Sequence, residues 1–269
     1  DQVRPGGPKE KQLVTGGGPC VSYFTLDTRK IPFEVRKAIA VAYPYDQINK
    51  ATGATPLSYA PATTLSPLSI PGMTPYKLDY ATGQGKGDQA KAKAMLTAAG
   101  KLGFEISYYY STDRPASAAA NEVRQQAFKQ AGFNVRPIGI PRTEARKKIA
   151  DPDAPVNTGQ GPAGWCYDWP SGDSVIPPIM SSKVLKSGQS VGFLSDAKVD
   201  SEIDRIMGLR IEDQGVEWAK LDKDIMTRLL PALPTTYSKE NYLFGTKVHN
   251  VVNDVNLGLP DISGIWVDQ

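Results

Sequence analysis

The stretch from Ala163 to Pro170 reads Ala-Gly-Trp-Cys-Tyr-Asp-Trp-Pro. Its apolar and aromatic residues predict a strand that ends in a lone carboxylate, Asp168, and breaks at the proline. The only other cysteine, Cys20, begins a second strand-like segment that runs to Asp27. Two cysteines in predicted strands, one acid and several aromatic side chains together predict a binding site in an oxidising compartment. Two buried free thiols are the alternative that the cysteine count leaves open.

Length and composition narrow the classes of protein to consider. The chain has 269 residues, 40% of them hydrophobic, which is enough for one large domain or two small ones. Charged residues make up 22%, and a formal net charge of +3 is too mild to predict nucleic-acid binding. The densest basic cluster, between Arg142 and Lys148, is expected to be a solvated helix face. No apolar run is long enough to span a membrane.

Metal ligands are scarce in this sequence. His249 is the one histidine, and the two cysteines lack the C-x-x-C spacing of zinc sites. We therefore expect no metal and no cofactor.

The order of the predicted elements indicates an α/β fold. Residues 1–19 are polar and rich in glycine and proline, which predicts a linker or tail. Strands are expected over residues 20–27, 104–110, 133–140 and 161–169, and helices over 88–99, 115–131 and 143–150, with another opening at Pro32 and two more before Pro231. Alternating strands and helices predict a mainly parallel sheet flanked by helices. The proline-rich stretch 53–80 is expected to be a long irregular loop.

Two predicted strand ends carry aromatic and acidic residues. One is the segment from Tyr110 to Asp113, and the other runs from Tyr167 to Trp169. In open parallel sheets, ligands bind where the carboxyl ends of the strands meet. These two segments are therefore expected to line one crevice, although the tyrosines could instead be half-buried sheet residues.

One motif suggests an enzyme. The run Gly188-Gln189-Ser190-Val191-Gly192 matches the G-x-S-x-G nucleophile elbow, and His249 follows in the order of the α/β-hydrolases. An elbow needs a buried strand before the serine and a helix directly after it. The residues on either side look instead like loops, so a secreted serine hydrolase that uses Ser190 and His249 is kept as an alternative.

Several segments, taken together, resemble the peptide-binding lipoproteins of bacterial ABC importers, the extracellular solute-binding proteins of family 5. The resemblance runs from Cys20 to the end of the chain. The matching segments are Cys20–Asp27 with Lys30–Ala40, Ala90–Gly100, Gly164–Pro170 and Gly264–Val267. They correspond to the hinge strand and following helix, a helix with an alanine–glycine stop, the family's most recognisable strand and turn, and its usual C-terminal finish.

The resemblance implies a domain organisation. Members of the family have two lobes and are considerably longer than this chain, and the match begins at the hinge. Residues 20–234 would form the second lobe, of the periplasmic-binding-protein type II fold, and residues 235–269 would return to the first lobe. The first lobe and the lipidated N-terminus would then lie outside this chain.

The resemblance also implies a site. In some oligopeptide-binding members both cysteines occur at matching positions and are bonded, which implies a disulfide between Cys20 and Cys166. The acid at the position of Asp168 binds the α-amino group of the peptide in those members. Apolar walls are expected from Trp165, Tyr167, Trp169 and Tyr23. Some members use an arginine just before the Gly-Trp pair for the peptide carboxylate. Pro162 and Ala163 stand there in this chain, so Arg114 is the substitute that we expect.

The implied function is that of the substrate-binding component of an ABC importer that captures peptides without any chemistry. Its partners would be a peptide or another small solute and the membrane permease, and it would contact the membrane only through an N-terminal lipid anchor. The expected location is extracytoplasmic, as a cell-surface lipoprotein or a periplasmic protein. Relatives also bind sugars, nickel chelates or haem, and these ligands remain alternatives.

Overall fold

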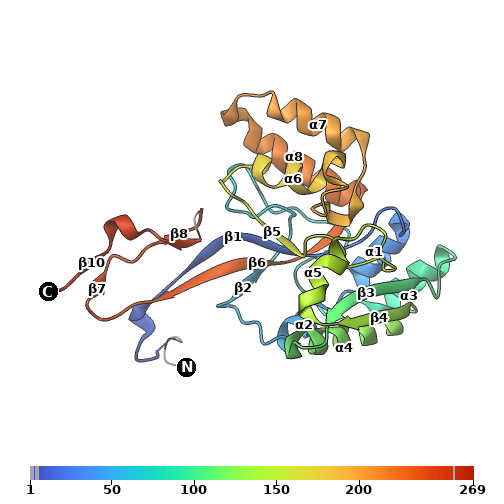
Figure 1. Cartoon of the computed structure of the whole chain (residues 1–269), viewed down its shortest axis with the longest axis horizontal. Coiled ribbons are helices and arrows are strands. Elements are labelled where there is room, and N and C mark those ends of the chain that lie inside the picture. Colours follow the sequence, from blue (N-terminus) through green and yellow to red (C-terminus); the bar gives the residue numbers. More distant parts are fainter. Residues whose placement is uncertain (1–2, 4–5, 81, 257) are drawn as a thin grey trace.

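The computed structural model describes residues 3, 6–80, 82–256 and 258–269. Two long strands, β1 (Leu13–Thr25) and β6 (Ala232–Leu243), run side by side through the molecule (Figure 1). At one end they enter a body of helices and sheet. At the other end they form an arm that leads to the C-terminal segment (Figure 1).

The larger sheet has four strands in the order β2-β6-β1-β5, and every neighbouring pair in it is antiparallel. Its edges are β2 (Tyr59–Pro61) and β5 (Gly164–Cys166). A separate sheet pairs β3 (Glu105–Ser111) with β4 (Asn134–Ile140) in parallel, and helix α4 (Pro115–Gln130) connects them. The α/β fold class is thus confirmed.

The expectation of a mainly parallel sheet needs correction. The β3–β4 pair is parallel as predicted, but the strand expected over residues 161–169 is three residues long and pairs antiparallel with β1. Helix α5 (Arg142–Ala150) and the segment after it carry the chain away from β4 to the other sheet. The two strand ends expected to share a crevice therefore belong to different sheets.

The remaining elements surround these sheets. The helices are α1 (Phe33–Ala42), α2 (Tyr45–Ala51), α3 (Gln89–Ala98), α6 (Ile176–Met180), α7 (Ala197–Met207) and α8 (Ile211–Arg228). Short 3-10 helices are η1 (Glu10–Gln12), η2 (Gly172–Ser174), η3 (Ser182–Val184), η4 (Val191–Phe193) and η5 (Ile262–Gly264). The C-terminal segment contains β7 (Val248–His249) paired with β10 (Trp266–Val267), and β8 (Asn253–Asp254) paired with β9 (Leu259–Pro260).

Residues 13–19, expected in a linker or tail, are part of β1, and residues 13–17 pair with β6. Their Gly-Gly-Gly-Pro composition is typical of loops, but β6 supplies hydrogen-bond partners for the main chain. The glycines also allow close contacts, since a Cβ atom on Gly16 would lie 2.1 Å from the side chain of Asn253. The division into a second lobe and a returning C-terminal segment stays a prediction.

Local capping explains where helix α3 begins and ends. The Asp88 carboxylate accepts a hydrogen bond of 2.9 Å from the Lys91 amide, which satisfies a free donor at the start of α3. Gly100 follows the end of that helix with a φ of 64°, a conformation that glycine adopts without strain. These signals predicted α3 to within one residue.

A buried carboxylate holds the long loop before α3 against helix α8. Asp222 is fully buried and accepts hydrogen bonds from the amides of Leu65 (3.1 Å) and Ser66 (2.8 Å) and from the Tyr76 hydroxyl (2.5 Å). Burial raises the pKa of this carboxyl, and the three donors counteract that shift. The irregular stretch is therefore ordered by specific contacts.

A second carboxylate links two helices and gives a test of the fold. Asp196 caps α7 through the Val199 amide (3.0 Å) and forms a bidentate pair with Arg228 of α8, at 2.7 and 3.0 Å. The Arg228 hydrogen bonds hold the pKa of Asp196 below its usual value. Asp196→Ala should lower the free energy of unfolding by about 1–2 kcal/mol at neutral pH, because the cap and the ion pair are both lost.

The dependence of this effect on pH has a definite sign. A carboxyl whose pKa is lower in the folded state stabilises fully above its unfolded pKa of about 3.9 and loses that contribution as pH falls through the folded value. Urea unfolding from neutral pH downward should therefore show the difference between the native chain and Asp196→Ala shrinking in acid. Asp196→Asn keeps an acceptor for the cap and should lose less. Equal losses in both variants would contradict the capping role.

Candidate functional site

Strand β5 is fixed to β1 by a covalent bond and by main-chain hydrogen bonds. Cys20 and Cys166 lie directly opposite each other in the register and form a disulfide, which confirms the expected pairing. The Tyr23 amide donates to the Ala163 carbonyl (2.7 Å), and the Tyr167 amide donates to the Pro19 carbonyl (3.2 Å). The strand is short, but main-chain hydrogen bonds flank it on both sides and the disulfide joins it to β1.

Gly164 allows this close approach. A Cβ atom at that position would lie 2.6 Å from the carbonyl oxygen of Val21, a distance that real Cβ atoms do not adopt. A side chain at position 164 would push β5 away from β1. The glycine of the Gly-Trp-Cys run is therefore a packing requirement of the strand pair.

The outer edge of β5 is open. β5 ends the strand order of the larger sheet, so one of its sides has no partner strand among the described residues. Ala163 and Tyr167 direct main-chain groups toward β1. Because direction alternates along a strand, the N–H and C=O groups of Gly164 and Cys166 point away from β1. These groups offer hydrogen bonds to an extended chain laid along the edge.

Asp168 lies just past the end of this edge. Its side chain is exposed and makes no hydrogen bond or ion pair with any residue that the structure describes. The neighbouring Trp169 is 52% exposed, and its Nε1 donates to the Asp173 carboxylate at 2.9 Å. A free carboxylate thus lies next to a fixed indole.

The other two aromatic residues of this run are anchored in the protein. The Trp165 Nε1 donates to the Ser174 carbonyl at 2.7 Å, and the ring is half-buried. Tyr167 is buried, and its hydroxyl contacts Ser69 Oγ (3.0 Å) and donates to the Val255 carbonyl (3.1 Å). Burial raises the pKa of the Tyr167 hydroxyl. This tyrosine joins β5 to the C-terminal segment and has little surface left for a ligand.

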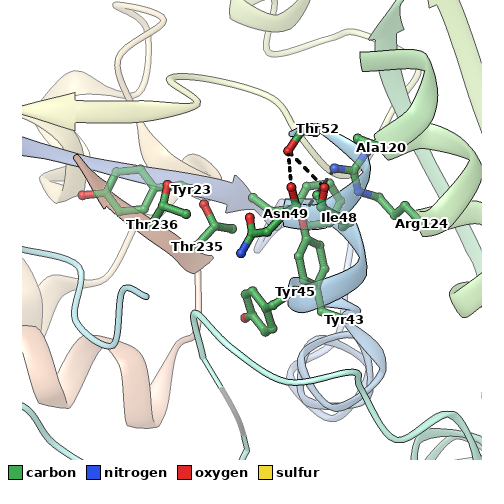
Figure 2. A pocket seen from close by; sticks show the side chains of 11 residues that line it. Tyr23, Tyr43, Tyr45, Ile48, Asn49, Thr52, Ala120, Arg124, Thr235 and Thr236 are labelled. Carbon is green, nitrogen blue, oxygen red and sulfur yellow. Dashed lines mark hydrogen bonds between the residues drawn. The ribbon is translucent and has the colours of Figure 1, made fainter. Parts of the chain in front are cut away.

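Two cavities near the sheet contain different members of the predicted site. Trp169 lines a groove of about 460 Å³ whose other walls include Pro71 and the exposed side chains of Ile211 and Val216. Tyr23 lines a separate cavity of about 240 Å³ between β1, β6, α2 and α4 (Figure 2). The Tyr23 ring is buried, and its hydroxyl donates to the Leu65 carbonyl. Tyr23 and Trp169 therefore do not share a cavity.

Arg114 lies on the smaller sheet's side of the molecule. It is the N-cap residue of α4, its side chain is exposed, and it forms no ion pair among the described residues. Nearby, the Asp113 carboxylate accepts hydrogen bonds from the Arg142 amide at 3.1 and 3.2 Å, so it caps α5. Neither cavity described above is lined by Arg114.

The nucleophile elbow of the alternative hydrolase interpretation is not formed. The Ser190 Oγ is buried without a hydrogen-bond partner, and the serine lies between two 3-10 helices, η3 and η4, with no strand before it or helix directly after it in this part of the described chain. His249 stacks on Trp266 with ring centroids 4.0 Å apart and contacts the Asp268 carboxylate at 3.0 Å. The geometry gives the hydrolase alternative no support.

Arg124 lines the same cavity as Tyr23 and is not among the site residues that the sequence predicted. A signal for it exists, because Ala120, Ala127 and Phe128 are buried on one face of α4 and Arg124 lies between them at helical spacing. A charged residue on the apolar face of a helix is unusual, and it therefore marks a candidate functional residue.

The described ranges contain no candidate for a membrane span or a metal site. None of their helices combines the length and the apolar character that crossing a membrane requires. No group of three or more His, Cys, Asp and Glu side chains within them could hold a metal ion.

Comparison with known proteins gives a consistent result. Residues 4–186, more than half of the chain, match the family model described as bacterial extracellular solute-binding proteins, family 5 Middle. No curated protein matches the chain. Solved structures match over nearly all of this chain, and the chain spans about half the length of each.

Three solved structures illustrate the likeness. HbpA2 from Haemophilus parasuis is 18% identical with a TM-score of 0.79, over 97% of this chain and 51% of the other. The clavulanic acid biosynthesis oligopeptide binding protein 2 is 18% identical with a TM-score of 0.81, over 96% and 48%. A dipeptide-binding protein from a Pseudoalteromonas species, solved with Met-Leu, is 17% identical with a TM-score of 0.71, over 99% and 52%. At these identities the likeness shows the fold.

The disulfide gives a test of how the site is held. The double variant Cys20→Ala, Cys166→Ala should lose up to about 5 kcal/mol of unfolding free energy in the chain-entropy model, because the bond closes a sequence separation of 146. Urea unfolding of both proteins measures the loss. Thiol titration of the native chain in denaturant without reductant should find no free thiol, and two free thiols would contradict the pairing.

Proposed function

The chain belongs to the bacterial extracellular solute-binding proteins of family 5, and on that premise we propose that it captures peptides as the substrate-binding component of an ABC importer. The coarser role, solute binding in ABC transport, follows from the family. The choice of peptides is the proposal, and so is the activity of the whole protein, because the chain spans about half the length of the structures it resembles.

The observation that carries the proposal is the unpaired carboxylate of Asp168 at the end of an open strand edge. The α-amino group of a peptide is a cation that a carboxylate binds through charge-assisted hydrogen bonds. A carboxylate already paired with an arginine or lysine could not serve this purpose. Asp168 is exposed and makes no such pair among the described residues.

The edge of β5 supplies the second element of recognition. An extended peptide can add to an open sheet edge, with main-chain hydrogen bonds for affinity and side-chain pockets for selectivity. The outward groups of Gly164 and Cys166 would pair with the peptide main chain. The first residue of the peptide would then lie beside Asp168, so the edge and the anchor act on one ligand.

Side-chain contacts would come from the exposed aromatic surface. Trp169, which follows Asp168 directly, and the half-buried Trp165 of β5 present apolar surface. We propose Arg114 as a contact for the peptide carboxylate, a role supported by its free, exposed guanidinium. Tyr167 and Tyr23 would act mainly as supports, since hydrogen bonds hold both hydroxyls inside the protein.

Location and partners follow the same proposal. A disulfide persists in oxidising compartments, which supports an extracytoplasmic protein. A permease would receive the solute, and an N-terminal lipid anchor would hold the protein at the membrane. Two solved relatives support peptides as the ligand class by their titles: one is in complex with Met-Leu, and the other, DppA from Helicobacter pylori, is in complex with the peptide STSA.

Asp168→Asn tests the anchor. The substitution keeps the shape of the side chain and removes its charge, so affinity for a tripeptide with a free amine should fall about fivefold, which corresponds to the ~1 kcal/mol of an exposed ion pair in water. Binding of the tripeptide to the chain is expected to be weak, because water competes with the ligand for an exposed carboxylate. Chemical-shift titration by NMR can measure such weak affinities.

Two controls make the result specific. Asp204→Asn removes an exposed carboxylate of α7 and should leave peptide binding unchanged. An N-acetylated tripeptide, which lacks the ammonium, should bind the native chain and Asp168→Asn equally weakly. If Asp168→Asn binds the free tripeptide as well as the native chain does, Asp168 is not the anchor.

A further inference from the structure

We propose that the cavity between α2, α4, β1 and β6 is a second binding site, which takes a small carboxylate with a flat apolar body at Arg124. Among the residues assigned above to peptide binding, Tyr23 lines this cavity, and Asp168, Trp165, Trp169 and Arg114 do not. The proposal goes beyond peptide capture and does not depend on it.

The first argument is an uncompensated positive charge. Arg124 is the charged residue of the cavity lining, and no carboxylate in the described part of the chain forms a salt bridge with it. Its Nη2 donates a long hydrogen bond of 3.4 Å to the Tyr43 hydroxyl, and its Nε is buried without a partner. A guanidinium removed from water without a counter-charge is costly, so an anion in the cavity would stabilise it.

The second argument is the position of the guanidinium among aromatic rings. Its central carbon lies 4.9 Å from the ring centroid of Phe24, 5.2 Å from that of Tyr108 and 5.8 Å from that of Tyr43. Cation–π contacts hold the group in place without neutralising it. The arginine is therefore pre-oriented, which lowers the entropy lost when a planar carboxylate binds to it.

The rest of the lining fits an apolar body with polar groups at its rim. Figure 2 shows Arg124 and the side chains of α2 on one side of the cavity and those of β1 and β6 on the other. Tyr23, Phe24 and Tyr43 supply aromatic surface, and Asn49 and Thr236 bring side chains that make no hydrogen bond within the described residues. Such groups can orient a ligand through hydrogen bonds.

The size of the cavity selects the kind of ligand. Its volume is about 240 Å³. An apolar protein cavity of about 150 Å³ accommodates benzene, so this one has room for a ring that carries a carboxylate. Benzoate is therefore a suitable probe, and benzamide is its neutral counterpart of the same shape.

The experiment titrates the chain with benzoate, benzamide and inorganic phosphate by calorimetry. Benzoate should bind, and benzamide and phosphate should bind at least about tenfold more weakly, because one lacks the charge and the other the apolar body. Arg124→Gln should weaken benzoate binding by about tenfold or more. Arg146→Gln removes the same charge from an exposed site on α5 and should leave benzoate binding unchanged.

A second variant covers the case in which Arg124→Gln fails to fold. Thr236→Phe keeps the arginine and fills the cavity from β6, where the residue pairs with Ser22. It should abolish benzoate binding without removing a charge. Failure of benzoate to bind the native chain, equal binding of benzamide or phosphate, or undiminished binding to Thr236→Phe would each overturn the proposal. None of these results bears on peptide binding at Asp168.

Discussion

The antiparallel pairing of β1 with both of its neighbours is the constraint on which the rest of the molecule depends. β1 lies between β6 and β5 in the larger sheet, and the Cys20–Cys166 disulfide joins it to β5. This one strand contributes to both proposed sites. Cys20 fixes the open edge that ends near Asp168, while Tyr23 and Phe24 form walls of the cavity at Arg124.

A second constraint orders the long loop that packs on this sheet. Proline-rich segments bury few main-chain hydrogen bonds of their own, so the loop needs partners elsewhere. Asp222 of α8 supplies acceptors for two consecutive amides, and Tyr23 of β1 donates to the Leu65 carbonyl between them. The helix and the strand thus hold the same two residues. Farther along the loop, Gly72 lies against the main chain of Gly215 in α8, and Pro71 and Gly72 line the groove beside Trp169.

Local signals in the sequence predicted the parallel pair and most of the helices, because caps and hydrophobic periodicity act over a few residues. They missed the two short helices α2 and α6. The Asp88 cap and the Gly132 stop are examples. The antiparallel sheet could not be predicted in this way, since β1 and β6 are separated by about two hundred residues and Gly16 to Gly18 have the composition of a loop. The same division between local and long-range contacts applies to the residues of the candidate site. Asp168 was evident as a lone acid in an aromatic run, whereas the burial of Tyr167 depends on Val255, far along the chain.

The two proposed sites, at Asp168 and at Arg124, differ in how strongly water screens the charged side chain. Asp168 is exposed, and an ion pair formed there at 4 Å in bulk water is worth about 1 kcal/mol, which an effective dielectric constant near 20 would raise to about 4 kcal/mol. A ligand held only by Asp168 would therefore gain little until a second surface excluded water. Arg124 is already partly enclosed by aromatic rings, so its charge acts in a drier environment without any movement of the protein. The charge at the proposed peptide site would therefore gain strength only when a second surface covers Asp168, whereas the aromatic rings around Arg124 are already in place in the described structure.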